Sequence, residues 1–320
     1  MAQSLLRPGA GTGARAGRTS AVTALTAVVP AVWGTTYLVT SEFLPPGYPL
    51  VSGVVRALPA GLILLAVTRR LPRGRWLWRS LVLGTLNIGA LFALLFVAAY
   101  RLPGGVAATL TAVQPLFVVG LAFALLGEKP TRWRLGWGLA GVAGVGLIVL
   151  RGRVAFDAVG VVAGVAAAGV MAGGIVLTKR WGRPEGVGPT ALAGWQLTAG
   201  GLVLAPIALV AEGLPSGLDG RAVGGYAWLT VAGALLSYPV WFRGIGRLPV
   251  VAVSFLALLS PVVAAVLGWL FLGQSLTAWQ GVGFVLALGA IAAAQLGPDA
   301  ARDLLFRTRA AKAAATIEGE

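Results

Sequence analysis

Residues 101–133 read RLPGGVAATLTAVQPLFVVGLAFALLGEKPTRW, and residues 247–279 read RLPVVAVSFLALLSPVVAAVLGWLFLGQSLTAW. Aligned with a shift of 146 residues, both stretches open on Arg-Leu-Pro, place Pro115 opposite Pro261, and close on Thr-x-Trp. Proline, tryptophan and arginine do not coincide in this way between two unrelated helices rich in Leu, Ala and Val. A weaker match, at a shift of 140 residues, pairs Pro49 with Pro189. The chain therefore contains two copies of one unit.

The composition is that of a membrane protein. Of the 320 residues, 58% are apolar and 11% are charged, and the mean hydropathy is +0.87, whereas soluble domains have about 45–50% apolar and about 25% charged residues. The apolar residues come in blocks of about 20, the helix length that crosses about 30 Å of hydrocarbon. The predicted spans are 22–42, 49–68, 80–99, 104–126, 133–150, 158–178, 190–211, 225–243, 249–272 and 278–296. This pattern predicts an all-α polytopic membrane protein and excludes a soluble globular enzyme, a disordered chain and a coiled coil.

The repeat and the spans together predict the architecture. Each copy holds five spans, and because five is odd, the second copy must enter the membrane from the opposite side. We therefore expect ten transmembrane helices arranged as two inverted five-helix repeats, 21–150 and 151–297. This symmetry is typical of transporters that bind substrate near the midplane. Residues 1–20 are polar and rich in Gly and Arg, which predicts a disordered cytoplasmic tail. Residues 298–320 form a second predicted cytoplasmic tail, either a short helix on anionic lipid or a solvated segment.

The basic residues orient the spans. The net charge is +15, and the chain has 25 Lys and Arg. With the N-terminus in the cytoplasm, four of the 25 fall outside, Arg56 lies within a span, and all the others fall inside. The four outside are Arg101, Arg151, Arg153 and Arg221. Because cytoplasmic loops carry the excess of Lys and Arg, we expect a multi-pass protein of the cell (inner or plasma) membrane with both termini cytoplasmic. A nucleic-acid partner is not expected, since the basic residues sit in short loops between apolar blocks.

Several kinds of chemistry are missing from the sequence. The chain has no Cys and no His, which excludes disulfides and thiolate catalysis and removes the commonest general base and metal ligand. It has no Gly-x-x-x-x-Gly-Lys-Ser/Thr motif for binding ATP, and no Asp or Glu at the middle of a predicted span. We expect no catalytic residues, no metal site and no cofactor.

Short motifs carry a family resemblance. The stretches WGTTYLVT (33–40), PPG (45–47) and RALPAG (56–61) resemble the opening of the EamA family, within the drug/metabolite transporter (DMT) superfamily. The GEK at 127–129 resembles the end of its repeat, and WQLTAGG (195–201) and YPVWFRGI (238–245) resemble its PecM-type exporter subgroup. The resemblance covers about 20–297 and implies a transporter of metabolites or drugs. The second copy departs from the pattern, because Gly273-Gln274 stands where the family has Gly-Glu.

Arg56 is the one charged residue within a predicted span. Such a charge costs about 2.5–3.5 kcal/mol on insertion scales, so it is a candidate for function. Arg56 lies about 12 Å along its helix, at ~1.5 Å per residue. Its side chain either extends outward to Glu42 or places a fixed positive charge or gate in the outer half of a cavity. Both interpretations hold if the Arg56–Glu42 pair opens and closes. The equivalent residue in the second copy is Gln196, on the inner half, so the two halves differ in charge.

Two prolines lie at equivalent places near the midplane. Pro115 and Pro261 each remove a helical hydrogen bond and free the carbonyls of Thr111 and Ala257. With Gln114 beside them, freed carbonyls can line a hydrated cavity and form a hinge. The alternative is a simple packing kink.

Aromatic and small polar residues complete the candidate site. Aromatic faces suit flat or cationic solutes, although core packing explains any one of them equally well. The remaining candidates for substrate binding or gating are Trp33, Thr36, Tyr37, Asn87, Tyr238 and Trp241.

These observations predict a transporter that moves a small metabolite, such as an amino-acid-like compound, a pigment or a drug, by alternating access. Export is the expected direction, and an importer of the same fold is an alternative. A second alternative is a non-transporting membrane sensor or assembly protein, which needs no hydrated midplane. The expected partners are the small-molecule substrate and the lipid bilayer. Small residues at helical spacing, from Gly136 to Gly144 and at Gly283 and Ala287, predict close helix packing or a homodimer.

Overall fold

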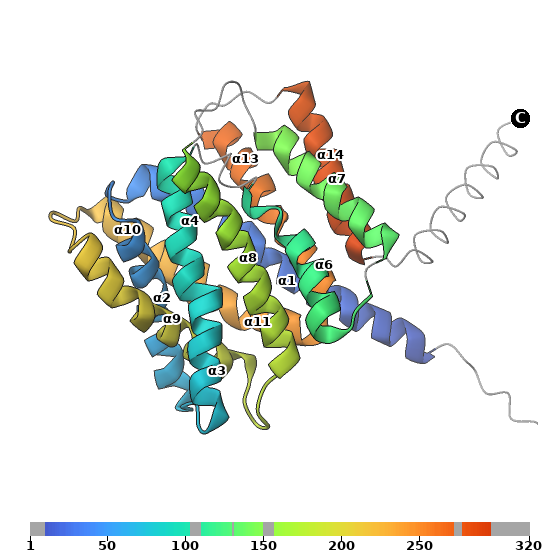
Figure 1. The fold of residues 1–320 in the computed structure, drawn as a ribbon, viewed down its shortest axis with the longest axis horizontal. Coiled ribbons are helices and arrows are strands. Elements are labelled where there is room, and N and C mark those ends of the chain that lie inside the picture. The colour runs from blue at the N-terminus through green and yellow to red at the C-terminus, as the bar shows by residue number, and fades with distance from the viewer. Residues whose placement is uncertain (1–9, 103–109, 130, 150–156, 272–276, 296–320) are drawn as a thin grey trace, which may run out of the picture.

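The computed structural model describes residues 10–102, 110–129, 131–149, 157–271 and 277–295, and the regular elements in these ranges are helical (Figure 1). A helix satisfies its backbone hydrogen bonds internally, which hydrocarbon requires. In chain order the elements are α1 (Ala10–Phe43), α2 (Pro49–Thr68), α3 (Arg75–Gly84), η1 (Thr85–Gly89), α4 (Ala90–Arg101), α6 (Gln114–Leu126), α7 (Arg132–Val149), α8 (Ala158–Trp181), α9 (Pro189–Ala211), α10 (Gly220–Thr230), η2 (Val231–Leu236), α11 (Ser237–Arg247), α12 (Val250–Leu256), α13 (Leu259–Phe271) and α14 (Ala278–Gln295). The all-α class predicted from the sequence is confirmed.

Several of these helices are long and apolar enough to cross a membrane. Within the described ranges there are seven of them. Three combine shorter elements: Arg75–Arg101 joins α3, η1 and α4, Gly220–Arg247 joins α10, η2 and α11, and Val250–Phe271 joins α12 and α13. The helices α6 and α14 are apolar but shorter. The chain is a multi-pass membrane protein, and the number of ten spans stays a prediction.

The disordered cytoplasmic tail over residues 1–20 stays a prediction. Helix α1 begins at Ala10, and its stretch that is apolar and long enough to cross a membrane begins at Thr19. Residues 1–9 and the predicted tail at 298–320 lie outside the described residues.

Equivalent helices of the two copies pack against each other. Helix α2 lies along α9, and the contact is made by glycines. A methyl group on Gly61 would lie 2.5 Å from the backbone nitrogen of Thr198, and one on Gly201 would lie 2.9 Å from Leu58 Cβ. The same shift of 140 residues that relates Gly61 to Gly201 also relates Leu58 to Thr198. Leu58, which is earlier in α2, contacts Gly201, which is later in α9, and Gly61 contacts Thr198. The helices α2 and α9 therefore run antiparallel.

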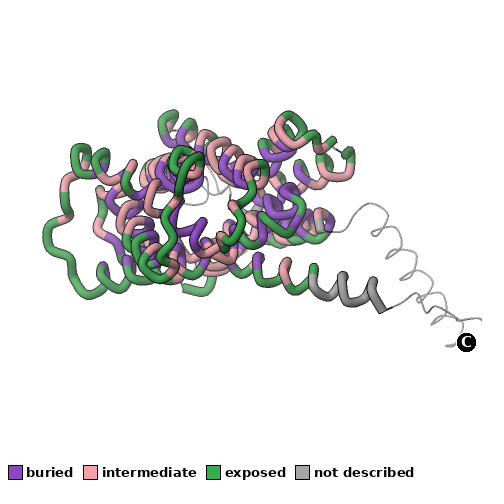
Figure 2. Tube along the Cα trace, turned by 90° about the horizontal axis from the view of Figure 1, so that it is seen from below, coloured by how far each residue is buried: buried purple, intermediate pink, exposed green. Residues whose placement is uncertain are grey.

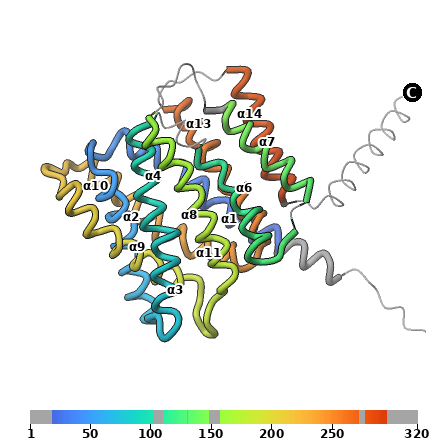
Figure 3. The backbone as a smooth tube through the Cα atoms, in the orientation of Figure 1, coloured from blue at the N-terminus to red at the C-terminus, as the bar shows by residue number. Residues whose placement is uncertain are grey.

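Helices α7 and α14 repeat this arrangement at one edge of the molecule (Figures 1 and 3). A methyl group on Gly144 would lie 2.7 Å from the backbone nitrogen of Ala287, and one on Gly141 would lie 3.1 Å from Ala290 Cβ. The shift of 146 residues carries Gly141 onto Ala287 and Gly144 onto Ala290. Gly144, which is later in α7, contacts Ala287, which is earlier in α14, so this pair is also antiparallel. The small residues of α7 and α14 thus pack within one chain, and a homodimer stays a prediction.

The interior helices are irregular at equivalent places. The π-helices η1 and η2 begin at Thr85 and Val231, which are 146 residues apart. The helix is also interrupted by turns at 112–113 and 257–258, just before Pro115 and Pro261. Single turns of π-helix and broken helices in a membrane protein are typical of functional sites. Buried residues gather toward the middle of the bundle (Figure 2). Both π-helices contribute to them, with Ile88 in η1 and Ala234 in η2.

Candidate functional site

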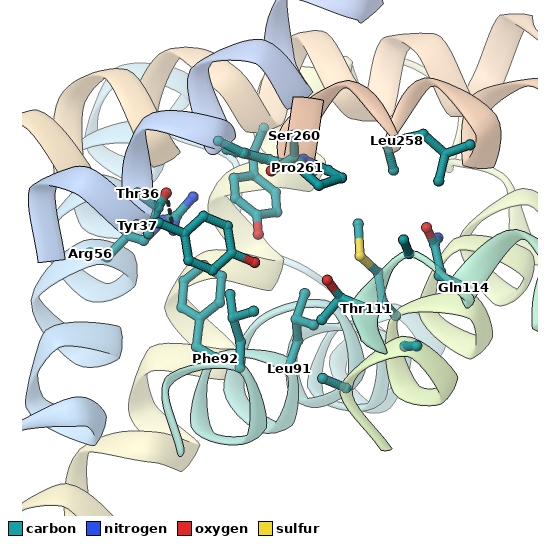
Figure 4. A pocket seen from close by; sticks show the side chains of 18 residues that line it. Thr36, Tyr37, Arg56, Leu91, Phe92, Thr111, Gln114, Leu258, Ser260 and Pro261 are labelled. Carbon is teal, nitrogen blue, oxygen red and sulfur yellow. Dashed lines mark hydrogen bonds between the residues drawn. The ribbon is translucent and has the colours of Figure 1, made fainter. Parts of the chain in front are cut away.

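A pocket, called the Arg56 pocket below, opens between the two copies. It encloses about 720 Å³ of empty space, its open mouth included. The first copy contributes side chains from α1, α2 and α4, from the segment before α6 and from the start of α6. The second copy contributes side chains from α8, from α11, from the break between α12 and α13 and from the start of α13. Figure 4 shows Arg56 and Thr36 at one end of the pocket and Gln114 at the other.

Arg56 is held by neutral groups from three helices. Its side chain is buried, with 2% of the residue exposed. Nη1 donates to Thr36 Oγ1 of α1 at 3.3 Å, and Nη2 donates to the carbonyl oxygen of Gly233 in η2 at 3.2 Å. The same carbonyl accepts a hydrogen bond from Trp33 Nε1 at 3.0 Å. The Arg56 guanidinium also lies 4.7 Å from the centre of the Phe92 ring, a cation–π contact. We call Thr36, Arg56 and Gly233, which the two Arg56 hydrogen bonds join, the Arg56 triad.

A second buried triad joins the equivalent helices of the other copy. Asn87 Nδ2, in η1, donates to Gln196 Oε1 of α9 at 2.7 Å and to Thr178 Oγ1 of α8 at 3.2 Å. All three residues are at most 5% exposed. We call this set the Asn87 triad. It lies outside the lining of the Arg56 pocket, although Tyr238, which lines the pocket, donates its hydroxyl to the backbone carbonyl of Asn87 at 3.5 Å.

The repeat relates the two triads through two of their three residues. Arg56 is equivalent to Gln196 at the shift of 140 residues, and Asn87 is equivalent to Gly233 at the shift of 146. Thr36 and Thr178 lie on the equivalent helices α1 and α8, but neither shift aligns them. Each triad ties the first two spans of one copy to the π-helix of the other copy. In the Arg56 triad, the long Arg56 side chain donates to the backbone carbonyl of Gly233. In the Asn87 triad, the amide side chains of Asn87 and Gln196 bond to each other. This difference arises because η1 has an asparagine where η2 has a glycine.

Aromatic side chains form one wall of the pocket. The ring centre of Trp33 lies 5.4 Å from that of Tyr238 and 5.0 Å from that of Trp241. Phe92 contacts Tyr238 edge-on, with the ring centres 6.4 Å apart. Tyr37 and Thr111 both line the pocket, and Figure 4 shows the Tyr37 hydroxyl directed toward Thr111. The wall is thus rigid and largely apolar, and its polar groups are few.

The structure brings most of the predicted site residues together. The predicted residues that line the Arg56 pocket are Trp33, Thr36, Tyr37, Arg56, Gln114, Tyr238 and Pro261. Asn87 and Gln196 belong to the Asn87 triad. Pro115 is buried outside the lining. Trp241 does not line the pocket, because it is buried behind Trp33 with 1% of its surface exposed.

The predicted Arg56–Glu42 pair is not formed. Glu42 is exposed near the end of α1, and its backbone carbonyl accepts a hydrogen bond from Arg221. Arg56 points inward to Gly233 instead. In the described residues the ion pairs are Arg101–Asp157 and Arg134–Glu128. The aromatic wall and the π-helix carbonyl offer Arg56 partners inside the bundle, so it does not extend to the surface.

Sequence reasoning missed several residues of the site. Phe92 and Met171 line the pocket, but a Phe or Met within an apolar span carries no distinguishing signal. Thr178 was missed as well, because neither repeat shift aligns it with Thr36. Within the described residues no group of three or more His, Cys, Asp or Glu is placed to hold a metal ion.

Comparisons with known proteins agree with this architecture. The EamA-like transporter family matches residues 21–150 and 158–294. Protein PecM of Dickeya dadantii is 45% identical over 82% of this chain and 88% of its own length. The uncharacterized inner membrane transporter YedA of Escherichia coli K12 is 30% identical over 80% of this chain and 85% of its own length. A solved crystal structure superimposes with a TM-score of 0.72, covering 86% of this chain and 98% of the other at 21% identity, and shows the fold alone.

Proposed function

The chain belongs to the EamA-like transporter family, and on this premise we propose that it carries a small metabolite across the membrane by alternating access, with the Arg56 pocket as its substrate site. We propose export from the cytoplasm across the cell membrane, with both termini cytoplasmic. The exporter-like motifs at 195–201 and 238–245 favour this direction. The substrate class proposed from the sequence is an amino-acid-like compound, a pigment or a drug.

The pair of equivalent triads is the observation that carries this proposal. In an inverted repeat, one copy adopts the conformation of the other when access changes sides. Such an exchange needs matched contacts at equivalent positions, one near each side of the substrate site. The Arg56 triad and the Asn87 triad support such an exchange, since each joins two helices of one copy to the π-helix of the other. The antiparallel packing of α2 on α9 and of α7 on α14 supports the inversion.

In the proposed cycle the Asn87 triad seals the cytoplasmic side of the pocket. By the predicted topology, Gln196 and Thr178 lie toward the cytoplasm and Arg56 lies toward the outside. Substrate leaves while the Asn87 triad is closed. The breaks before Pro115 and Pro261 let the two halves of each broken helix move separately, after which the triads exchange roles.

Comparing the metabolites excreted by cells with and without the gene tests the transport function. At least one compound is expected to fall in the medium and rise in the cells when the gene is deleted, and complementation with the intact gene restores it. An unchanged profile under inhibition of other exporters contradicts export. Accumulation in the medium of the deletion strain indicates an importer instead.

Labelling separates a transporter from a membrane sensor. Because the chain has no native cysteine, Gln114→Cys gives a single reactive site in the pocket. A water-soluble thiol reagent is expected to modify it, whereas a sensor without a hydrated pocket protects it. Val162→Cys on the outer face of α8, which is 67% exposed in the bundle, is the control that lipid shields.

A further inference from the structure

We propose that the Arg56 pocket accepts an elongated organic anion. In this assignment an oxyanion group binds at Arg56, a flat apolar body lies along the aromatic wall, and a hydrogen-bond acceptor meets Gln114 at the far end. The assignment rests on the transport function proposed above and narrows its substrate class.

The charge of Arg56 has no counter-ion among the described residues. Its two terminal nitrogens donate to neutral oxygens, and its Nε has no hydrogen-bond partner. The described ion pairs are Arg101–Asp157 and Arg134–Glu128, and no Asp or Glu lines the pocket. A buried charge without a counter-ion carries a desolvation penalty of several kcal/mol. A ligand that brings a carboxylate offsets this penalty and fits the planar guanidinium.

Glycine leaves room beside the unpartnered nitrogen. A methyl group added to Gly233 would lie 3.4 Å from both Nε and Nη2 of Arg56. At the equivalent position of the other triad, the side chain of Asn87 fills this place and meets a neutral amide. The Arg56 triad therefore combines a cation with an unfilled space beside its free N–H, and the Asn87 triad has neither.

The far end of the pocket presents a second unpartnered donor. Gln114 is 2% exposed, and its Nε2 has no hydrogen-bond partner. Figure 4 shows it at the end of the pocket opposite Arg56, with Tyr37 and Phe92 between them. Donors at both ends require acceptors on the ligand. An amine group is disfavoured, because the lining offers no carboxylate to pair with it.

Binding to the purified full-length protein tests the assignment. The probes are 3-(4-hydroxyphenyl)propionate, its primary amide and the corresponding primary amine, which share one body and differ in head group. Titration calorimetry is expected to show that the carboxylate binds about tenfold tighter than the amide, or better, and that the amine binds most weakly. A tenfold difference corresponds to ~1.4 kcal/mol.

Variants assign the preference to Arg56. Arg56→Gln copies its equivalent Gln196 and is expected to reduce the carboxylate-to-amide ratio to about twofold or less. Gly233→Ala keeps the charge but narrows the space beside Nε, and should weaken the carboxylate more than the amide. Gly224→Ala, in a position with open space around it, is the control and should leave the ratio unchanged. Gln114→Leu is expected to weaken the hydroxylated probe relative to 3-phenylpropionate.

The outcomes separate this assignment from the transport function. Equal binding of amide and carboxylate, a preference that survives Arg56→Gln, or binding of none of the three probes overturns the anionic class. The excretion experiment is independent of these probes. An excreted compound that is neutral or cationic therefore refutes the anionic class while the transporter stands. An unchanged excretion profile under inhibition of other exporters refutes the proposed export, whatever the probes show.

Discussion

Asn87 Nδ2 and Gln196 Oε1 lie 2.7 Å apart, in the shortest side-chain contact of the Asn87 triad, and they join η1 of one copy to α9 of the other. Both residues are buried, and Gln196 Nε2 has no partner. Asn87 therefore makes both hydrogen bonds that join the helices of this triad, on the proposed cytoplasmic side of the pocket.

Asn87→Ala is expected to open that side. Leaving a buried group unsatisfied costs about 1–3 kcal/mol, which shifts an equilibrium about 5- to 150-fold. With Met171→Cys as the reporter in the pocket, a thiol reagent supplied from the cytoplasmic side of inside-out vesicles should react correspondingly faster.

Ser254→Ala is the matched control for this prediction. Ser254 is equally buried, but its hydroxyl bonds to Val251 within its own helix. Its loss removes a buried hydrogen bond without separating helices. If Asn87→Ala and Ser254→Ala label at the same rate, the Asn87 triad does not seal the pocket.

Much of the fold could be predicted from sequence because apolar length and repetition are local signals. The span boundaries, the placement of Pro115 and Pro261 and the burial of Arg56 all follow from counting along the chain. The partners of Arg56 could not be predicted in this way. The backbone carbonyl of Gly233 leaves no mark in a sequence, and the π-helix that presents it is identified by geometry alone. The sequence therefore pointed to Glu42, the nearest residue of opposite charge.

The two triads show what the repeat could have added. The alignment of Arg56 with Gln196 follows from the sequence alone, and so does the alignment of Asn87 with Gly233. Asn87 was predicted to line the cavity, as Gln196 was, because both are polar residues in an apolar span. Their contact with each other depends on how the two copies cross, and crossing angles are set by small residues such as Gly200 through close packing in three dimensions.

Replacing either of the two equivalent prolines, Pro115 or Pro261, tests the hinge. Pro115→Ala and Pro261→Ala restore a backbone donor and let the helix continue across the break, while leaving the packing nearly intact. Each should fold normally yet transport several-fold more slowly in proteoliposomes, about 1 kcal/mol in barrier. Pro206→Ala, at an exposed site inside α9, is the control. Normal flux in both Pro115→Ala and Pro261→Ala means that the two prolines serve packing only.

Gly200 tests the packing of η1 on α9. A side chain there would collide with the carbonyl oxygen of Gly84 and with Ile88 Cβ, while the backbone nitrogen of Gly89 lies 2.9 Å away. Gly200→Ala should lower the free energy of unfolding by about 1–3 kcal/mol through overpacking. Thermal unfolding in detergent measures the change. Gly224→Ala, with nothing near it, should be neutral or slightly stabilising, because Ala favours helix. Equal stability of the two variants would show that η1 and α9 separate easily.

The loop after the first span of each copy tests the inversion directly. The loop between α1 and α2 is equivalent to the loop between α8 and α9, and inverted repeats must place them on opposite sides of the membrane. Pro46→Cys and Glu185→Cys are exposed positions in these loops, in a chain that has no other cysteine. In intact cells an impermeant maleimide is expected to label Pro46→Cys, whereas Glu185→Cys should react only after the membrane is permeabilised. Arg69, Arg70 and Arg183, which flank the proposed cytoplasmic ends of α2 and α8, are the physical reason for this orientation. Labelling of both positions in intact cells would place the two loops on one side, and the antiparallel pairing of α2 with α9 could then not correspond to inverted repeats crossing a bilayer.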